Sequence, residues 1–209
     1  MWRLTEMTAV DERPITETAA ERHESLEASY RSLEVPGKLK VELLRDEIVM
    51  MAGPDWVHNL IVLFVERQIP IDNWYPVQTQ DLSIPGEPAE PQPDLVVVEH
   101  GAFEGPGRLV PAPAVTLVLE VVSKSSIDRD YGVKRSIYAA GRVPAYLIID
   151  PTEARCALLT EPTGSGEDAD YRVERTAKFG DPLPLDMLGI ELDTSRFGTL
   201  PPVRTHRRP

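Results

Sequence analysis

Two apolar segments separated by a helical one constrain the fold of this chain most. The segments "AVTLVLEVVS" (114–123) and "PAYLIIDP" (144–151) read as strands, and the second is apolar on both faces, as a strand within a sheet is. Residues 128–140 between them are predicted to form a helix with one apolar face, closed by Gly141. A strand, a helix and a strand in this order predict a parallel pair with a right-handed crossover.

The segments before this unit supply further elements. Residues 54–70 predict a buried helix with Asp55 as its N-cap and Pro70 as its stop. The other predicted elements are a helix over 18–34, two strands within 38–53 joined by a tight turn at Arg45-Asp46, a strand over 73–84, a short strand over 94–100 and a final hairpin from 154–160 and 170–176. The expected fold is α/β: a mixed sheet with flanking helices in the core order αβββαβ, plus an N-terminal helix and β-hairpin.

Length and composition bound the domain organisation. A chain of 209 residues suits one domain, expected over 18–196, after a frayed or disordered segment over 1–17 and before a basic tail over 197–209. The single cysteine, Cys156, allows no internal disulfide, which favours a reducing cytoplasm. No apolar run reaches the roughly 18 residues of a membrane span.

The formal net charge of −12 argues against broad nonspecific attraction to nucleic acid. It still allows a locally basic groove. It also allows a carboxylate site that needs a metal cation before it can approach a phosphate group.

Two carboxylates are candidates for such a site. Asp94 begins a strand and Glu120 lies late in an apolar one, so pairing of these strands would bring both to one edge of the sheet. Two carboxylates and a backbone carbonyl suit Mg²⁺, which could polarise a phosphoryl oxygen and activate water. The alternative is that each carboxylate is solvated or pairs with a nearby Lys or Arg. Asp150 has a similar setting and is expected to be a turn former before Pro151.

The alternation of side chains along a strand helps to decide which lysine could assist the two carboxylates. The residue that shares a face with Glu120 is Val122, which carries no charge. Lys124 follows in a predicted strand exit and is expected to turn toward solvent. Lys134, on the following helix, could return over the sheet edge to the site. The alternative is that Lys134 is a solvent-exposed lysine of the helix with no role in the site.

Several segments together resemble the Uma-two family of restriction endonucleases, a branch of the PD-(D/E)XK nuclease superfamily. They are "PQPDLVVVE", "LVLEVVSKSS" and "DRDYGVKRSIYAAGRVPAYLIIDP", with "VELLRDEIVMM" and "HNLIVLFVERQI" upstream, and the likeness covers roughly residues 35–195. Most relatives carry Ser-Pro-Ser where this chain has Ser123-Lys124-Ser125. This departure keeps Lys124 as an alternative to Lys134.

The resemblance implies a set of site residues. Asp94 and Glu120 would be metal ligands, with the Val121 carbonyl as a third, and Lys134 would be the displaced lysine of the superfamily motif. Tyr138 belongs to the same helical motif. Glu42, His58 and Gln80 fall at positions that the family often uses around its cleft. Glu42 could instead form an ion pair with Lys40 or Arg45. His58 could only help to start its helix, and Gln80 could be a polar residue at the end of a strand.

These residues lead to three functional hypotheses. The first is an endonuclease that hydrolyses DNA phosphodiester bonds with Mg²⁺ (or Mn²⁺), with Lys134 assisting. The second is a catalytically weak or inactive module that keeps the fold, and the third is a metal-dependent RNA phosphodiesterase. A homodimer is expected by analogy with nucleases that cut both strands, and no membrane partner is expected.

Overall fold

The computed structural model of the chain describes residues 18–34 and 39–202. Its helices are α1 (Ala19–Ser32), α2 (Trp56–Glu66) and α3 (Lys134–Ala140). Its strands are β1 (Leu39–Leu44), β2 (Glu47–Ala52), β3 (Trp74–Gln78), β4 (Leu82–Ser83), β5 (Ala89–Glu90), β6 (Leu95–Glu99), β7 (Val110–Pro111), β8 (Val115–Val121), β9 (Ala145–Asp150), β10 (Arg155–Thr163), β11 (Asp170–Lys178), β12 (Leu183–Leu185) and β13 (Ile190–Leu192). The expectations for residues 1–17 and for 203–209 of the tail lie outside the described residues.

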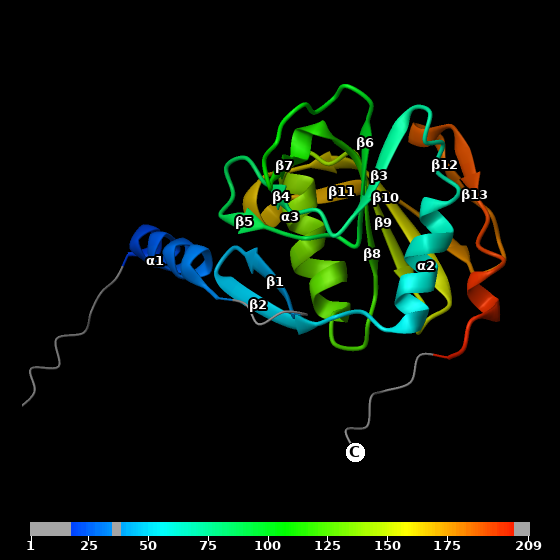
Figure 1. Cartoon of the computed structure of the whole chain (residues 1–209), viewed down its shortest axis with the longest axis horizontal. Helices are drawn as coiled ribbons and strands as arrows, with labels where there is room; N and C mark the ends of the chain where they lie inside the picture. The colour runs from blue at the N-terminus through cyan, green and yellow to red at the C-terminus, as the bar shows by residue number, and fades with distance from the viewer. Residues whose placement is uncertain (1–17, 35–38, 203–209) are drawn as a thin grey trace, which may run out of the picture.

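A six-stranded mixed sheet forms the centre of the molecule (Figure 1), in the order β11-β10-β9-β8-β6-β3. The pair β8 and β9 is parallel and the other neighbours are antiparallel. Helix α3 connects the two parallel strands, as expected for a strand-helix-strand unit. The predicted α/β class with a mixed sheet is therefore confirmed.

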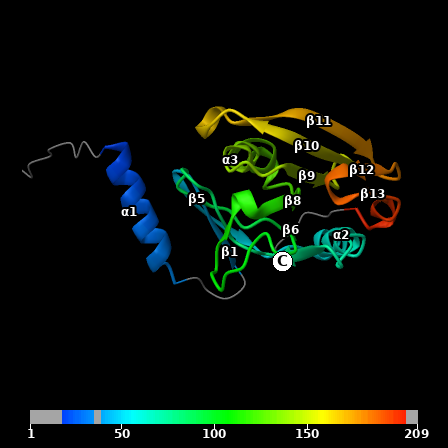
Figure 2. The same cartoon turned by 90° about the horizontal axis from the view of Figure 1, so that it is seen from above.

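The sheet separates two hydrophobic cores, one beneath α3 and the other beneath α2, and the two helices lie on opposite sides in Figure 2. Alternation along β8 sends Val118 to the α3 core and Leu117 and Leu119 to the α2 core. Glu120 has the parity of Val118. Its side chain therefore points toward α3, which carries Lys134.

The β1–β2 hairpin is tied to the central domain by Arg45. The predicted turn is present, and Arg45 adopts a left-handed φ of 56° in it. Its guanidinium donates to Glu87 (2.7 Å), to Ser136 Oγ (2.8 Å) and to the Gly166 carbonyl (2.9 Å). These contacts, with the pairing of β1 and β5, fix where the inward side chains of β1 point. Helix α1 lies to one side of this hairpin in Figure 1.

Two predicted elements differ in detail. The strand expected over 73–84 is interrupted at Thr79, whose left-handed φ of 52° turns the chain, so the segment continues as the separate strand β4. The helix expected over 128–140 begins as a π-helical turn over Arg129–Val133, and α3 follows it.

Gly141 ends α3 for a different reason from the one expected. Its φ is −70°, so it is not a left-handed cap. A Cβ there would lie 2.9 Å from Cβ of Ala112 and 3.2 Å from Ile84. Close approach of the chain therefore favours glycine, and Arg142 adopts the left-handed φ of 61°.

The C-terminal region covers the α2 core. Phe197, at the start of the expected basic tail, is only 3% exposed and packs edge-on against Phe179, with ring centroids 5.3 Å apart. Cys156 is buried within β10. None of the helices among the described residues combines the length and the apolar character that a membrane crossing requires.

Candidate active site

Strand register brings Asp94 and Glu120 together. Leu95 of β6 is paired with Leu119 of β8, so the residues that flank this pair are neighbours across the two strands. The Asp94 amide donates to the Leu119 carbonyl at 3.1 Å, which holds the start of β6 against β8. Both carboxylates open onto a cleft of about 440 Å³ between the β1–β2 hairpin, α2 and the beginning of α3.

Asp94 has one oxygen held by donors and one directed at a cation. Oδ2 accepts the Val121 amide at 2.8 Å and lies 3.1 Å from Nε2 of His58. Helix α2 presents His58 because Asp55 caps the helix by accepting the His58 amide at 2.9 Å. Oδ1 lies 3.5 Å from Nζ of Lys40.

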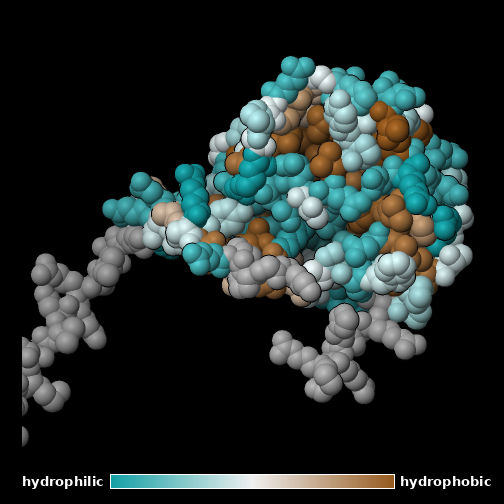
Figure 3. All heavy atoms as spheres, viewed as in Figure 1, coloured by the Kyte–Doolittle hydropathy of each residue, from teal (hydrophilic) through white to brown (hydrophobic). Residues whose placement is uncertain are grey.

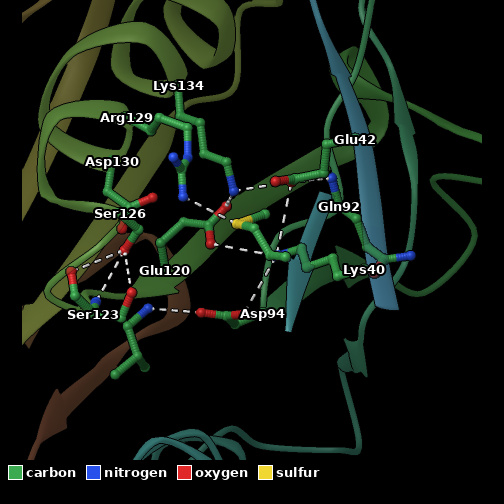
Figure 4. A network of polar contacts seen from close by, with 12 residues as sticks. Lys40, Glu42, Gln92, Asp94, Glu120, Ser123, Ser126, Arg129, Asp130 and Lys134 are labelled. Carbon is green, nitrogen blue, oxygen red and sulfur yellow. Dashed lines mark hydrogen bonds and ion pairs between the residues drawn. The ribbon is translucent and has the colours of Figure 1, made fainter. Parts of the chain in front are cut away.

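Glu120 is arranged in the same way (Figure 4). Oε1 accepts Lys134 Nζ at 2.7 Å, as Figure 4 shows. It also accepts the Tyr138 hydroxyl at 2.6 Å, and both donors come from α3. Oε2 lies 3.9 Å from Nζ of Lys40. Lys134 is 1% exposed, so it is the lysine that reaches Glu120, whereas Lys124 is exposed in the turn after β8.

Glu42 joins the site from β1. Its Oε1 accepts the Gln92 amide at 2.7 Å and lies 2.9 Å from Lys134 Nζ and 3.7 Å from Lys40 Nζ. Its Oε2 is buried and has no hydrogen-bond partner within the described part of the chain. Of the two partners considered for Glu42 as an alternative, Lys40 is within reach, whereas Arg45 is committed to Glu87.

Lys40 was not among the candidate site residues, although its ammonium lies between Asp94, Glu120 and Glu42. Alternation along β1 puts Lys40 and Glu42 on one face of the strand, and this signal was present in "KVE". Asp130 was also missed. It is 2% exposed, and Ser126 is its hydrogen-bond partner.

Gln80 does not reach this site. Its side-chain amide donates to the Asp81 carbonyl at 3.0 Å and to the carbonyl of Arg108. Asp150 behaves as the turn former that was expected, because Oδ1 accepts the amides of Thr152 at 2.8 Å and Glu153 at 3.1 Å.

The buried charges perturb one another. Burial raises the pKa of Glu120 to about 7, against the opposing effects of Lys134 and Lys40, and Asp94 and Asp130 add to the rise. Burial also disfavours ionised Asp94, but Lys40 and His58 outweigh it and hold the pKa of Asp94 below its ordinary value of 3.8.

The carboxylates of Glu42 and Glu120 share the Lys134 ammonium. Burial opposes ionisation of Glu42, but Lys134, Lys40 and the Gln92 amide hold its pKa below the ordinary value. Burial disfavours the charged form of Lys134 as well, yet Glu120 and Glu42 keep the pKa of Lys134 above its ordinary value of 10.5. Lys134 is therefore an ammonium at neutral pH, and of the two glutamates that share it, Glu120 takes up a proton more readily than Glu42.

The chemistry of this cluster fits a hard divalent cation. Asp94 Oδ1 and Glu120 Oε2 face the same position, which a positive charge already approaches, and Mg²⁺ prefers oxygen ligands. Among residues 18–34 and 39–202, no three His, Cys, Asp or Glu side chains form a ready-made ligand set. Two carboxylates with a backbone carbonyl would leave the remaining positions to water and substrate.

Comparisons with known proteins agree on the kind of protein. Residues 27–195 match a family model named Uma2 and described as "Putative restriction endonuclease". The fold is similar to the crystal structure of a "putative nuclease belonging to DUF820" from Anabaena variabilis, with a TM-score of 0.61 and 10% sequence identity. The match covers 82% of this chain and 96% of that one. No curated protein matches the sequence significantly.

Proposed function

The chain belongs to the Uma2 family of restriction-endonuclease-like proteins, and on this basis we propose that it hydrolyses DNA phosphodiester bonds with Mg²⁺ (or Mn²⁺). The proposed ligands are Asp94, Glu120 and the carbonyl of Val121. The family supports a nuclease function. The metal, the DNA substrate and the residue roles are our proposals.

One observation carries the proposal. In both Asp94 and Glu120, hydrogen bonds from the protein hold one carboxylate oxygen, and the other oxygen faces a common cation position. Such orientation before binding reduces the ordering that a metal ion would require. A Mg²⁺ ion at this position would polarise a phosphoryl oxygen and activate a water molecule for attack.

Lys134 would act through its charge. Because two carboxylates keep it protonated, it is not available as a general base at neutral pH. It orients Glu120 and Glu42, and its positive field would favour the negative charge that develops on the phosphoryl group.

The proposal is tested with supercoiled plasmid in the presence of Mg²⁺ or Mn²⁺. The wild type is expected to nick or linearise the plasmid, and Asp94→Asn and Glu120→Gln to lose at least about 100-fold in rate, since removal of one charge-stabilising group commonly costs this much. Arg175→Met, on β11 far along the sheet, is the control. Equal cleavage by the wild type and both site variants would refute the proposal.

The position of Lys40 favours the second hypothesis, a module that keeps the fold but hydrolyses weakly or not at all. Its ammonium already compensates the carboxylates that a metal ion would need. Calorimetric titration with Mn²⁺ distinguishes the active nuclease from this module, because the module would bind no metal. RNA as the substrate is distinguished by a parallel cleavage assay, and the expected homodimer by light scattering.

A further inference from the structure

Arg129 lines the cleft beside Asp94 and Glu120, and no carboxylate among the described residues forms an ion pair with its guanidinium. Its Nη2 donates to Sδ of Met51 at 3.1 Å (Figure 4). Its Nε is buried and has no hydrogen-bond partner in the part of the chain that the structure describes. A thioether is a weak acceptor, and a buried donor left without an acceptor is unfavourable.

The net charge of −12 means that carboxylates are plentiful, and Arg45, Arg135 and Arg175 each pair with one. Among the described residues, Arg155 also has a buried Nε without a hydrogen-bond partner, but its guanidinium lies over the Tyr131 ring, whereas Arg129 lines the cleft. Two carboxylates flank Arg129 in sequence. Ser126 engages Asp130, and no ion pair joins Asp128 to Arg129 in the described part of the chain. The guanidinium of Arg129 therefore lines the cleft without a carboxylate partner from its own segment.

The π-helical turn accounts for the position of Arg129. The Lys134 amide donates to the Arg129 carbonyl, which closes a turn of five residues. Residues that close such a turn lie on one side of the helix, whereas in an α-helix a residue and the fifth after it point about 140° apart. The turn thus directs Arg129 and Lys134 toward the same cleft, as Figure 4 shows.

We propose that Arg129 binds a phosphate group of the nucleic-acid strand next to the bond that is cleaved. A guanidinium offers a planar fork of N–H donors that matches two phosphate oxygens. Binding would replace the thioether with a charged acceptor and satisfy the buried Nε. This inference rests on the proposed nuclease function and adds a subsite for substrate outside the metal ligands.

Binding of a fluorescein-labelled DNA duplex, followed by anisotropy, tests the subsite. Ca²⁺ replaces Mg²⁺, and a gel checks that the probe stays intact. Arg129→Met is expected to bind about tenfold more weakly than the wild type, and the slope of log Kd against log salt should fall by about 0.9 because one phosphate contact is lost. Arg175→Met removes the same charge three strands away from β8 and is expected to bind like the wild type.

Arg129→Lys keeps the charge and removes the fork. It is expected to bind more weakly than the wild type with an unchanged salt slope, and it decides the question should Arg129→Met fail to fold. The proposed subsite would be overturned if Arg129→Lys bound the duplex as tightly as the wild type. It would also be overturned if Arg129→Met and Arg175→Met bound the duplex equally well. A wild type that neither binds the duplex nor cuts plasmid would instead refute the proposed function itself.

Discussion

At the scale of single residues, Lys40 occupies the position proposed for the metal ion. Its ammonium lies 3.5–3.9 Å from one oxygen each of Asp94, Glu42 and Glu120, so the cluster is partly neutralised without a metal ion. A divalent cation between Asp94 and Glu120 would repel this ammonium. Binding of the proposed metal ion would therefore require Lys40 to move or to share the position.

We expect Lys40→Met to bind Mn²⁺ more tightly than the wild type. The gain should be roughly fivefold or more, the equivalent of about 1 kcal/mol for one partly screened charge interaction. Calorimetric titration measures it, with Arg175→Met as the matched charge control. Unchanged or weaker Mn²⁺ binding in Lys40→Met would show that this ammonium does not compete with the metal.

The raised pKa of Glu120 predicts a pH dependence of stability. Burial raises this pKa from 4.5 to about 7, so between these values the folded protein binds more protons than the unfolded chain. The contribution of Glu120 is fully present below pH 4.5 and is lost as the pH rises through 7. Glu120→Gln removes this titration.

Urea unfolding at pH 5 and pH 8 measures the effect. The free energy of unfolding of Glu120→Gln, relative to the wild type, should be higher at pH 8 than at pH 5. A difference between the two proteins that does not change with pH would argue against a raised pKa at this residue.

At the scale of elements, the π-helical turn and α3 position the charged side chains of the cleft. Glycine occurs at two places in this segment, for different reasons. A Cβ at Gly132 would meet no atom within 4 Å, whereas a Cβ at Gly141 would lie 2.9 Å from Cβ of Ala112.

Gly132→Ala and Gly141→Ala therefore form a matched pair. Gly132→Ala should stabilise the protein by about 0.4–1 kcal/mol, because alanine restricts the unfolded chain without a clash. Gly141→Ala should destabilise it by about 1–3 kcal/mol through overpacking. Thermal unfolding of both variants is the measurement, and changes of the same sign in both would contradict this account.

At the scale of the whole molecule, a net charge of −12 opposes a polyanionic substrate. Hydrophilic residues cover much of the face in Figure 3, with hydrophobic residues scattered among them. The cleft gathers the cationic groups Lys40, Arg129 and Lys134, but its lining also holds carboxylates, namely Asp55, Asp94, Glu120 and Asp130. A divalent cation in the site would shift this balance of charge toward positive.

DNA binding should consequently depend on a divalent cation. At constant ionic strength, the duplex probe is expected to bind about tenfold more tightly in Ca²⁺ than in EDTA, since the metal reduces repulsion next to the phosphates. Asp94→Asn should lose most of this difference. Equal affinities of the wild type in Ca²⁺ and EDTA would indicate that binding does not use the site.

The sequence by itself determined the strand-helix-strand unit, the turn at Arg45-Asp46 and the proximity of Asp94 and Glu120. These features depend on local rules: strand alternation, turn chemistry and the apolar patterns of neighbouring strands. The sequence favoured Lys134 over Lys124 through the expected strand exit at Lys124 and the family resemblance, and it left Lys124 open as an alternative. In the structure it is Lys134 that donates to Glu120.

Only the tertiary structure decided which other side chains meet at the cleft. Lys40 arrives from a hairpin that Arg45 anchors to α3, and Arg129 arrives through a π-helical turn that regular helical periodicity does not anticipate. Gln80 was assigned to the cleft, but the break at Thr79 leads it to another part of the surface. Long side chains and irregular turns depend on packing between distant segments, so local sequence patterns could not place them.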